Sequence, residues 1–195
     1  MTRASGAVRA AVLLALAAPL LAGCSSGEHG NHSDLNSGAN GEISPGASLS
    51  SADVMFAQMM IPHHQQAVEM GILAETRASS PEVKALAASI KAEQAPEIAL
   101  MKSWLKAANA PLRMDHSMVM AGLLTDADMK ALTEASGVKF DRLFLEGMIG
   151  HHEGAIEMAK VVIDSSNADV RSLSETIISS QAAQITYMKT LLAND

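Results

Sequence analysis

The chain has 195 residues, of which 48% are hydrophobic and only 3% aromatic, and its formal net charge is −7. This negative charge argues against nucleic acid or an anionic lipid surface as a binding partner. The chain contains a single cysteine, which excludes an internal disulfide bond.

Residues 1–23 have the features of an export signal, with positive charge at Arg3 and Arg9 followed by a short apolar run. The run ends in Leu-Ala-Gly-Cys at 21–24, which resembles the lipobox of bacterial lipoproteins, where the cysteine is acylated. The alternative is an ordinary secretory signal with an incidental cysteine. Lipidation of Cys24 would anchor the protein to a membrane outside the cytoplasm. Removal of the signal would change the formal charge from −7 to −9.

Residues 24–50 predict a flexible tether. They are rich in Gly, Ser and Asn and carry few large apolar side chains, so they bury too little surface to fold. A tether of this length has a root-mean-square reach on the order of 28 Å. It would therefore hold the following domain just off the membrane. His29 and His32 lie in this segment, either solvated or in loose contact with metal.

Residues 51–195 predict one all-α domain, because Ala, Leu and Met are common and strand-like alternation is absent. Capping residues are expected at Ser79 or Ser80, at Thr125 and at Asn167. The long helices are expected at about 52–77, 81–108, 138–164 and after 167, with a loop at 109–124 and a short helix ending near 137.

Two halves of this domain, about 51–108 and 138–195, repeat each other. Met-Met-Ile-Pro-His-His-Gln-Gln-Ala-Val-Glu-Met at 59–70 corresponds to Gly-Met-Ile-Gly-His-His-Glu-Gly-Ala-Ile-Glu-Met at 147–158. Each half is a helical hairpin that cannot cover its own apolar face, so two hairpins are expected to pair into a four-helix bundle. A pseudo-twofold relation could bring the two His pairs together.

The repeated motif predicts a metal site. Helical spacing places one methionine between the two adjacent histidines and a second methionine two turns beyond, around a small alanine. Thioethers favour Cu(I), and imidazoles accept Cu(I), Cu(II) or Zn(II), so copper is expected, with Cu(I) favoured. The alternative is that the methionines fill the core and the histidines are satisfied core residues. The candidate ligands are His63, His64, Met60 and Met70, and His151, His152, Met148 and Met158.

Four polar residues accompany the motif. Glu69 and Glu157 fall on another helix face and are expected to be solvated or to support the ligands. Gln94 and Gln181 lie on otherwise apolar stripes. They are expected either to accept a hydrogen bond from a histidine ring N–H or to lie at the stripe edge and reach water.

A second candidate site lies in the connecting loop. Residues 114–120 read Met-Asp-His-Ser-Met-Val-Met and resemble the Met/His runs of extracytoplasmic copper proteins. They could contact metal, or they could form a hydrophobic segment that covers the end of the bundle. The candidate ligands are Met114, His116, Met118 and Met120.

The doubled His-His-x-x-Ala-x-x-Met pattern, with Phe-Asp-Arg-Leu-Phe-Leu-Glu at 140–146, resembles the bacterial domain-of-unknown-function family 305 over about 51–194. The resemblance implies a ferritin-like four-helix bundle, usually exported, with copper binding and tolerance in some relatives. It also implies that the four paired histidines, with their neighbouring methionines, are the shared motif. Ferritin-like di-iron enzymes use Glu-x-x-His motifs. Since no Glu-x-x-His occurs in the chain, ferroxidase or oxygenase chemistry is not expected.

We therefore expect a non-enzymatic, envelope-anchored protein that binds copper for buffering, tolerance or transfer to a partner protein. One alternative is a structural or protein-interaction module of the envelope that binds no metal. A third reading is a redox enzyme that uses bound copper. The sequence leaves open whether the two His pairs form one site or two.

Overall fold

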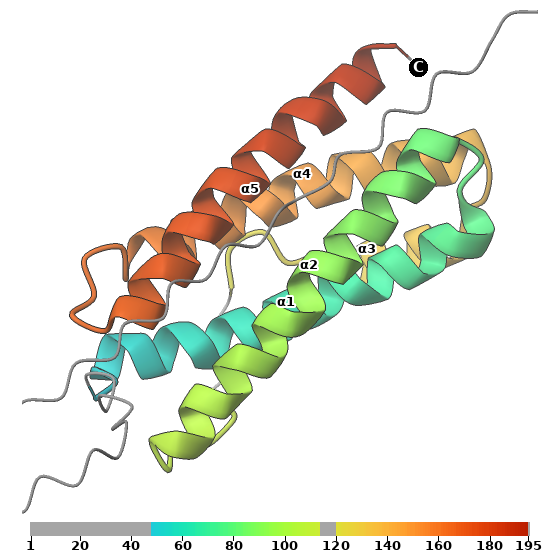
Figure 1. The fold of residues 1–195 in the computed structure, drawn as a ribbon. Helices are drawn as coiled ribbons and strands as arrows, with labels where there is room; N and C mark the ends of the chain where they lie inside the picture. Colours follow the sequence, from blue (N-terminus) through green and yellow to red (C-terminus); the bar gives the residue numbers. More distant parts are fainter. Residues whose placement is uncertain (1–47, 114–119, 195) are drawn as a thin grey trace, which may run out of the picture. The chain divides into compact units, whose positions relative to one another are not determined.

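The computed structural model describes residues 48–113 and 120–194 (Figure 1). Within these ranges there is no strand, and the predicted all-α class is confirmed. The helices are α1 (Ser51–Arg77), α2 (Pro81–Ala107), α3 (Asp126–Glu134), α4 (Val138–Lys160) and α5 (Ala168–Ala193).

The helices begin where side chains can cap their first free N–H groups. Ser50 and Asp53 form a capping box at the start of α1, and Thr125 begins a second capping box at α3. Ser80 accepts hydrogen bonds from the first turn of α2, and Asn167 does so for α5. Of the two serines considered for α2, the structure therefore uses Ser80.

Two helices end earlier than expected. Helix α4 ends at Lys160 rather than near 164, because the N–H groups of Val161 and Val162 turn back to the third preceding carbonyl in tighter turns. Helix α3 ends at Glu134, because Ala135 adopts an extended conformation before Gly137, whose φ is 65°.

The two repeats form two antiparallel hairpins, α1 with α2 and α4 with α5 (Figure 1). The hairpins meet through α1 and α4, and α3 packs against both of these helices. Helices α1 and α4, which carry the histidine motifs, therefore lie at the centre of the bundle.

The apolar core consists of two clusters. The Phe140 cluster contains Ala67, Met70 and Met148, and the Phe56 cluster contains Met60, Ala155 and Met158, each with further aliphatic residues. Each cluster thus takes one methionine from each copy of the motif. Because the histidines lie between these positions along both helices, they separate the two clusters.

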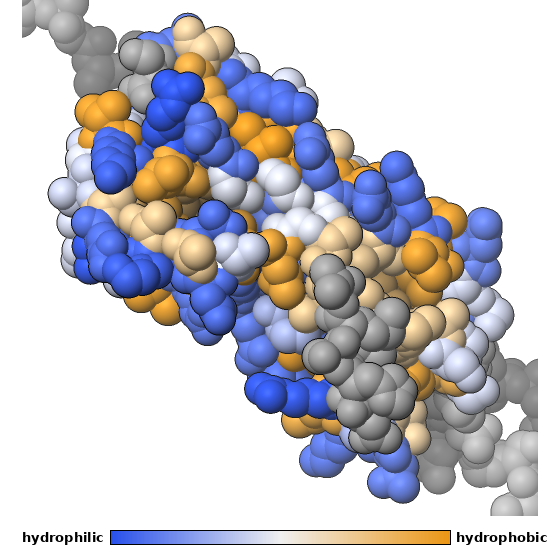
Figure 2. Space-filling model, turned by 180° about the vertical axis from the view of Figure 1, so that it is seen from behind, coloured by the Kyte–Doolittle hydropathy of each residue, from blue (hydrophilic) through white to orange (hydrophobic). Residues whose placement is uncertain are grey.

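The surface is mixed in polarity. On the face shown in Figure 2, hydrophobic residues lie among hydrophilic ones. No helix among the described residues is apolar over a long enough stretch to cross a membrane. The exposed large apolar side chains are distributed over several helices and loops: Met55, Ile72, Leu100, Leu112, Val138, Val161 and Tyr187.

Candidate metal centre

The four motif histidines meet in one buried layer. His63, His64, His151 and His152 are all 0% exposed. The ring centroids of His63 and His151 lie 3.7 Å apart across the contact between α1 and α4. Within each repeat the two ring centroids are 6.4 and 6.3 Å apart. The repeat therefore brings both pairs into a single cluster.

The two inner histidines bind backbone carbonyls. Nε2 of His63 lies 3.1 Å from the carbonyl oxygen of Ala121, and Nε2 of His151 lies 3.0 Å from that of His63. A carbonyl oxygen can only accept, so Nε2 is the protonated nitrogen in both rings. One loop carbonyl thus orients His63, and the backbone of His63 orients His151.

The two outer histidines bind side chains of the flanking helices. Nε2 of His64 lies 2.7 Å from Oε2 of Glu97 on α2, and Nε2 of His152 lies 2.7 Å from Oε1 of Gln184 on α5. Both partners are acceptors, so Nε2 again carries the hydrogen. All four rings therefore have the same tautomer.

The Nδ1 atoms of all four rings are buried without a hydrogen-bond partner among the described residues. Since Nε2 holds the hydrogen, each neutral ring has an unused lone pair at Nδ1. A buried polar atom left without a partner costs about 1–3 kcal/mol. Neutral imidazole nitrogen is the commonest metal ligand in proteins. The donor chemistry of the layer thus fits a metal ion.

Burial lowers the pKa of three rings of the layer, His63, His151 and His152, and so favours their neutral form. Burial lowers the pKa of His63 to about 3, with repulsion from His64 as the next cause. Burial lowers the pKa of His152 to about 4, although its hydrogen bond with Gln184 opposes this shift. Burial and repulsion from His63 and His152 hold the pKa of His151 well below its ordinary value. Neutral imidazole is the form that binds metal.

The layer is not a preformed coordination polyhedron. Over residues 48–113 and 120–194, no three His, Cys, Asp or Glu side chains are arranged so that they could hold a metal ion. The feature of the layer that fits a metal ion is therefore its four unpartnered Nδ1 atoms and not its ligand geometry.

The candidate methionine ligands are core residues. Met60, Met70 and Met148 are 0% exposed, and Met158 is 8% exposed. Met60 and Met158 lie in the Phe56 cluster, and Met70 and Met148 in the Phe140 cluster. This is the placement that the core-filling alternative expects. It also puts one pair of thioethers on each side of the histidine layer.

The crossing loop, residues 120–124, packs against α1 and α4 at the level of the histidines. Gln66 holds it through two hydrogen bonds to the backbone of Leu124, with Nε2 donating at 3.0 Å and Oε1 accepting at 2.8 Å. Gly154 allows the close approach to α4, since a Cβ there would lie 2.1 Å from the carbonyl oxygen of Ala121. The loop therefore presents the Ala121 carbonyl to His63.

Of the four loop candidates, only Met120 lies among the described residues. It is half-buried and packs against the Phe56 cluster, which contains Met60 and Met158. Met114, His116 and Met118 lie outside the described residues.

The prediction for the two glutamines was wrong. Gln94 and Gln181 are buried, and the Oε1 atom of each has no hydrogen-bond partner among the described residues. The outer histidines instead bind Glu97 and Gln184, about one turn farther along the same helix faces. The sequence does contain a signal for these partners, since positions 97 and 184 are both polar and are equivalent in the repeat.

Glu69 and Glu157, which were expected to be solvated or to support the ligands, are exposed.

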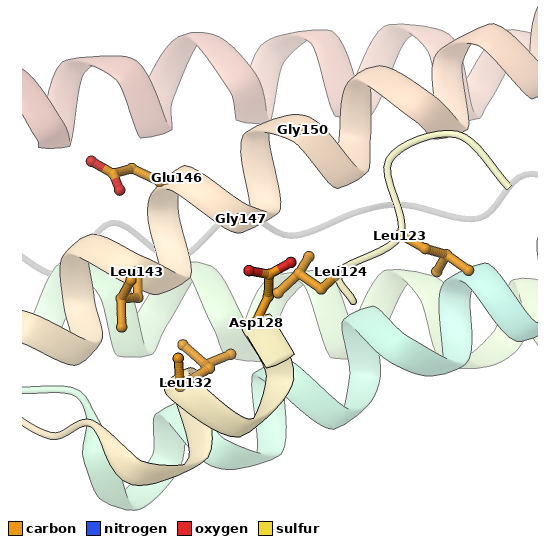
Figure 3. Close-up of a pocket in the computed structure, with 9 residues that line it drawn as sticks. Leu123, Leu124, Asp128, Leu132, Leu143, Glu146, Gly147 and Gly150 are labelled. Carbon is orange, nitrogen blue, oxygen red and sulfur yellow. The ribbon is translucent and has the colours of Figure 1, made fainter. Parts of the chain in front are cut away.

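A pocket of about 320 Å³ lies beside the histidine layer, between α3, α4 and the crossing loop (Figure 3). Its lining includes Leu124, Asp128, Leu132 and Gly150. None of the four layer histidines contributes to this lining, so the pocket is separate from the candidate metal centre.

Comparison with solved structures gives several relatives of the same fold. A DUF305 protein from Streptomyces coelicolor, provisionally described as secreted, is 34% identical with a TM-score of 0.71, covering 74% of this chain and 93% of that chain. A DUF305 fragment from Deinococcus radiodurans is 27% identical with a TM-score of 0.70, covering 75% and 98%. CopM in the Cu(I)-bound form is 35% identical with a TM-score of 0.62, covering 73% and 96%. No curated protein matches the chain.

The same CopM protein also matches in Cu(II)-bound, Ag-bound and apo forms. The family described as a domain of unknown function (DUF305) matches residues 53–192, which include nearly all of both hairpins and the whole histidine layer. The chain therefore belongs to the DUF305 family.

Proposed function

We propose that this protein is an envelope-anchored copper-binding protein that buffers the ion or passes it to a partner protein, without catalytic activity. The observation that carries the proposal is the layer of four buried imidazoles whose Nδ1 lone pairs have no partner among the described residues. Copper is the cargo of such a protein, and the rings of His63, His64, His151 and His152 would supply its nitrogen donors.

The choice of copper is supported by the relatives. CopM, at 33–35% identity, has been solved with Cu(I), Cu(II) and silver bound. Imidazole accepts copper in both oxidation states, whereas thioether sulfur favours Cu(I). We assign Met60, Met70, Met148 and Met158 the role of soft donors that favour Cu(I).

The loop would act as a capture arm. Met120 packs against the same cluster as Met60 and Met158, so the Met/His run ends next to the layer. In this proposal Met114, His116, Met118 and Met120 bind copper first and release it to the buried histidines.

The location outside the cytoplasm is supported by the signal-like residues 1–23 and by the provisional description of the Streptomyces coelicolor relative as secreted. Acylation of Cys24 would anchor the protein to the membrane, with residues 24–50 as its tether. Mass spectrometry of the membrane fraction tests this directly. A mature chain that begins with diacylated Cys24 is expected, and an unmodified cysteine would exclude the anchor.

Copper binding is tested by anaerobic titration of the chain from residue 25 onward with Cu(I) against a chromophoric chelator, with Cu(II) and Zn(II) in parallel. The critical variant replaces all four layer histidines with glutamine. A glutamine amide keeps an N–H close to the position of Nε2 but puts no lone pair at the position of Nδ1. Tight, stoichiometric binding that the variant loses is expected.

Two controls separate the alternatives. Replacement of the tether histidines His29 and His32 by glutamine should leave binding unchanged, and circular dichroism should show that every variant stays helical. Equal binding by the wild type and the four-glutamine variant would leave the layer as a structural feature of an envelope interaction module.

A further inference from the structure

The two outer histidines, His64 and His152, are equivalent in the repeat but have chemically different partners. We propose that Glu97 is a positioning residue that makes His64 a stronger copper donor than His152. This inference rests on the proposed function and names the residue that determines which half of the site holds copper more tightly.

The contacts of His64 and His152 form a matched pair within the molecule. Glu97 on α2 and Gln184 on α5 occupy equivalent positions, and each accepts from an outer histidine Nε2 at 2.7 Å. His64 and His152 are both fully buried. The remaining difference at the contact is a carboxylate in one half and an amide in the other.

A carboxylate is the stronger acceptor. Hydrogen bonds to an ionised acceptor are roughly twice as strong as those between neutral groups. The Glu97 side chain is 15% exposed, and the His64 ring is 0% exposed, so the contact lies largely out of water. Strong acceptance from Nε2–H moves electron density toward Nδ1, which makes that nitrogen the better ligand.

In the other half, the amide oxygen of Gln184 is held in place as a neutral, weaker acceptor. Nε2 of Gln184 donates to Oε2 of Glu93 at 2.8 Å, so its oxygen must face His152. Here the carboxylate of Glu93 acts on the ring only through the intervening amide of Gln184. The negative charge of Glu93 therefore acts on His152 less strongly than the negative charge of Glu97 acts on His64.

The oxidation state of copper provides a specific signature. A negative charge next to a ligand stabilises Cu(II) more than Cu(I), because the ion carries one more positive charge. Glu97 should thus lower the Cu(II)/Cu(I) reduction potential of the bound ion. A residue that only helped the protein to fold would not move this potential in a defined direction.

The test compares the wild type with Glu97→Gln, which makes the two halves alike while keeping an acceptor at the same reach. Glu69→Gln, on the exposed surface of α1, removes the same charge away from this contact and serves as the matched control. The converse variant is Gln184→Glu combined with Glu93→Gln, because two carboxylates would otherwise face each other. All variants carry the chain from residue 25 onward.

Loss of a supporting residue beside a metal ligand commonly weakens affinity about 10- to 100-fold. We expect Glu97→Gln to weaken Cu(II) binding about tenfold more than Cu(I) binding, which corresponds to a rise of about 59 mV in potential. The converse variant should shift the potential downward, and Glu69→Gln should not shift it. If the protein holds copper only as Cu(I), Glu97→Gln should weaken Cu(I) binding, the converse variant should strengthen it, and Glu69→Gln should leave it unchanged. Wild-type affinity and potential in Glu97→Gln would overturn the inference while leaving copper binding itself intact.

A second measurement needs no metal. In proton–nitrogen spectra of the apo protein, the Nε2 proton of His64 should resonate farther downfield than that of His152, and Glu97→Gln should abolish the difference. Equal resonances in the wild type would overturn the inference even if copper binds. Absence of copper binding in the wild type would instead contradict the proposed function, and the inference would fall with it.

Discussion

A histidine ring in this layer divides its two nitrogens between two tasks. Nε2 is used for structure, since it donates to a carbonyl, a carboxylate or an amide oxygen in each ring. Nδ1 has no hydrogen-bond partner within residues 48–113 and 120–194. The Nε2 contacts therefore hold each ring in the fold, and Nδ1 is the nitrogen left to donate to an ion.

At the same scale, substitution can separate the contribution of the methionines to copper binding from that of the histidines. Leucine closely matches the volume of methionine, so Met60→Leu and Met158→Leu should each change the free energy of unfolding by less than about 1.5 kcal/mol. Because only the thioether sulfur is lost, Cu(I) affinity should fall while Cu(II) affinity stays nearly constant. Chelator competition in both oxidation states measures this.

The matched pair on the other side of the layer is Met70→Leu with Met148→Leu. If the layer takes thioether donors from both clusters, this pair should behave like the first. Unchanged Cu(I) affinity in both pairs would assign the methionines to core packing alone.

At the scale of elements, the crossing loop breaks the repeat. Gln66 on α1 holds the loop, and its equivalent on α4 is Gly154, where the loop backbone passes. As a result the inner histidines have different partners, the Ala121 carbonyl for His63 and the His63 carbonyl for His151. The connection between the hairpins is thus part of the candidate site.

This close approach gives a sharp comparison of two glycines on α4. In Gly154→Ala the new Cβ would lie 2.1 Å from the Ala121 carbonyl oxygen, so the loop must move and His63 loses its acceptor. We expect a loss of about 1–3 kcal/mol in the free energy of unfolding, as for an overpacked core. Gly150→Ala meets nothing within 4 Å and should stabilise the helix by about 0.5–1 kcal/mol.

Urea unfolding followed by circular dichroism measures both glycine variants under the same conditions. A Gly154→Ala protein as stable as Gly150→Ala would mean that the crossing loop does not lie against α4 in solution.

The helices could be predicted because their signals are local. Ser80 with Pro81, Thr125 and Asn167 mark helix starts through contacts with the next few residues. The end of α4 at Lys160 was missed because residues 161–164 contain no helix-breaking residue. In the structure these residues form tighter turns, in which N–H groups bond the third preceding carbonyl.

The candidate site was predictable in part because the motif is repeated. The exact repetition of the His pair indicated that His63 and His151 could meet, and their ring centroids are 3.7 Å apart. The acceptors of the rings were not predictable. Ala121 contributes a backbone carbonyl, which no side-chain pattern reveals, and the choice of Glu97 over Gln94 depends on helix rotation of less than one turn.

At the scale of the whole molecule, the fold should not depend on copper. The Phe56 and Phe140 clusters provide an apolar core on both sides of the histidine layer. We expect the protein to be fully helical in excess chelator. Copper that binds only the folded state should add about 2.7 kcal/mol at a free concentration 100 times its dissociation constant.

Thermal melts with chelator and with buffered copper measure this difference. An apo protein without a cooperative transition would contradict the assignment of stability to the two apolar clusters. A melting temperature that copper leaves unchanged would contradict binding to the folded layer.

The buried layer also makes the whole fold sensitive to acid. The pKa values of His63 and His152 are about 3 and about 4 in the folded protein, below the value of 6.5 expected when the chain is unfolded. Between these limits the unfolded chain binds more protons than the folded one. The stability contributed by the neutral rings is therefore fully present above about pH 6.5 and is lost as the pH falls toward 4. Each such proton changes the free energy of unfolding by about 1.4 kcal/mol per pH unit.

Urea unfolding of the apo protein between pH 7.5 and 4.5 should accordingly give a free energy that falls with pH over this window. The variant with glutamine at all four layer positions is the control, because it keeps hydrogen-bond donors in the layer but has no imidazole there to protonate. Its stability should change less over the same window, because the four buried imidazoles are gone. If both proteins lost stability in parallel, the acid sensitivity would come from carboxylates elsewhere, and the rings would not be held neutral by burial.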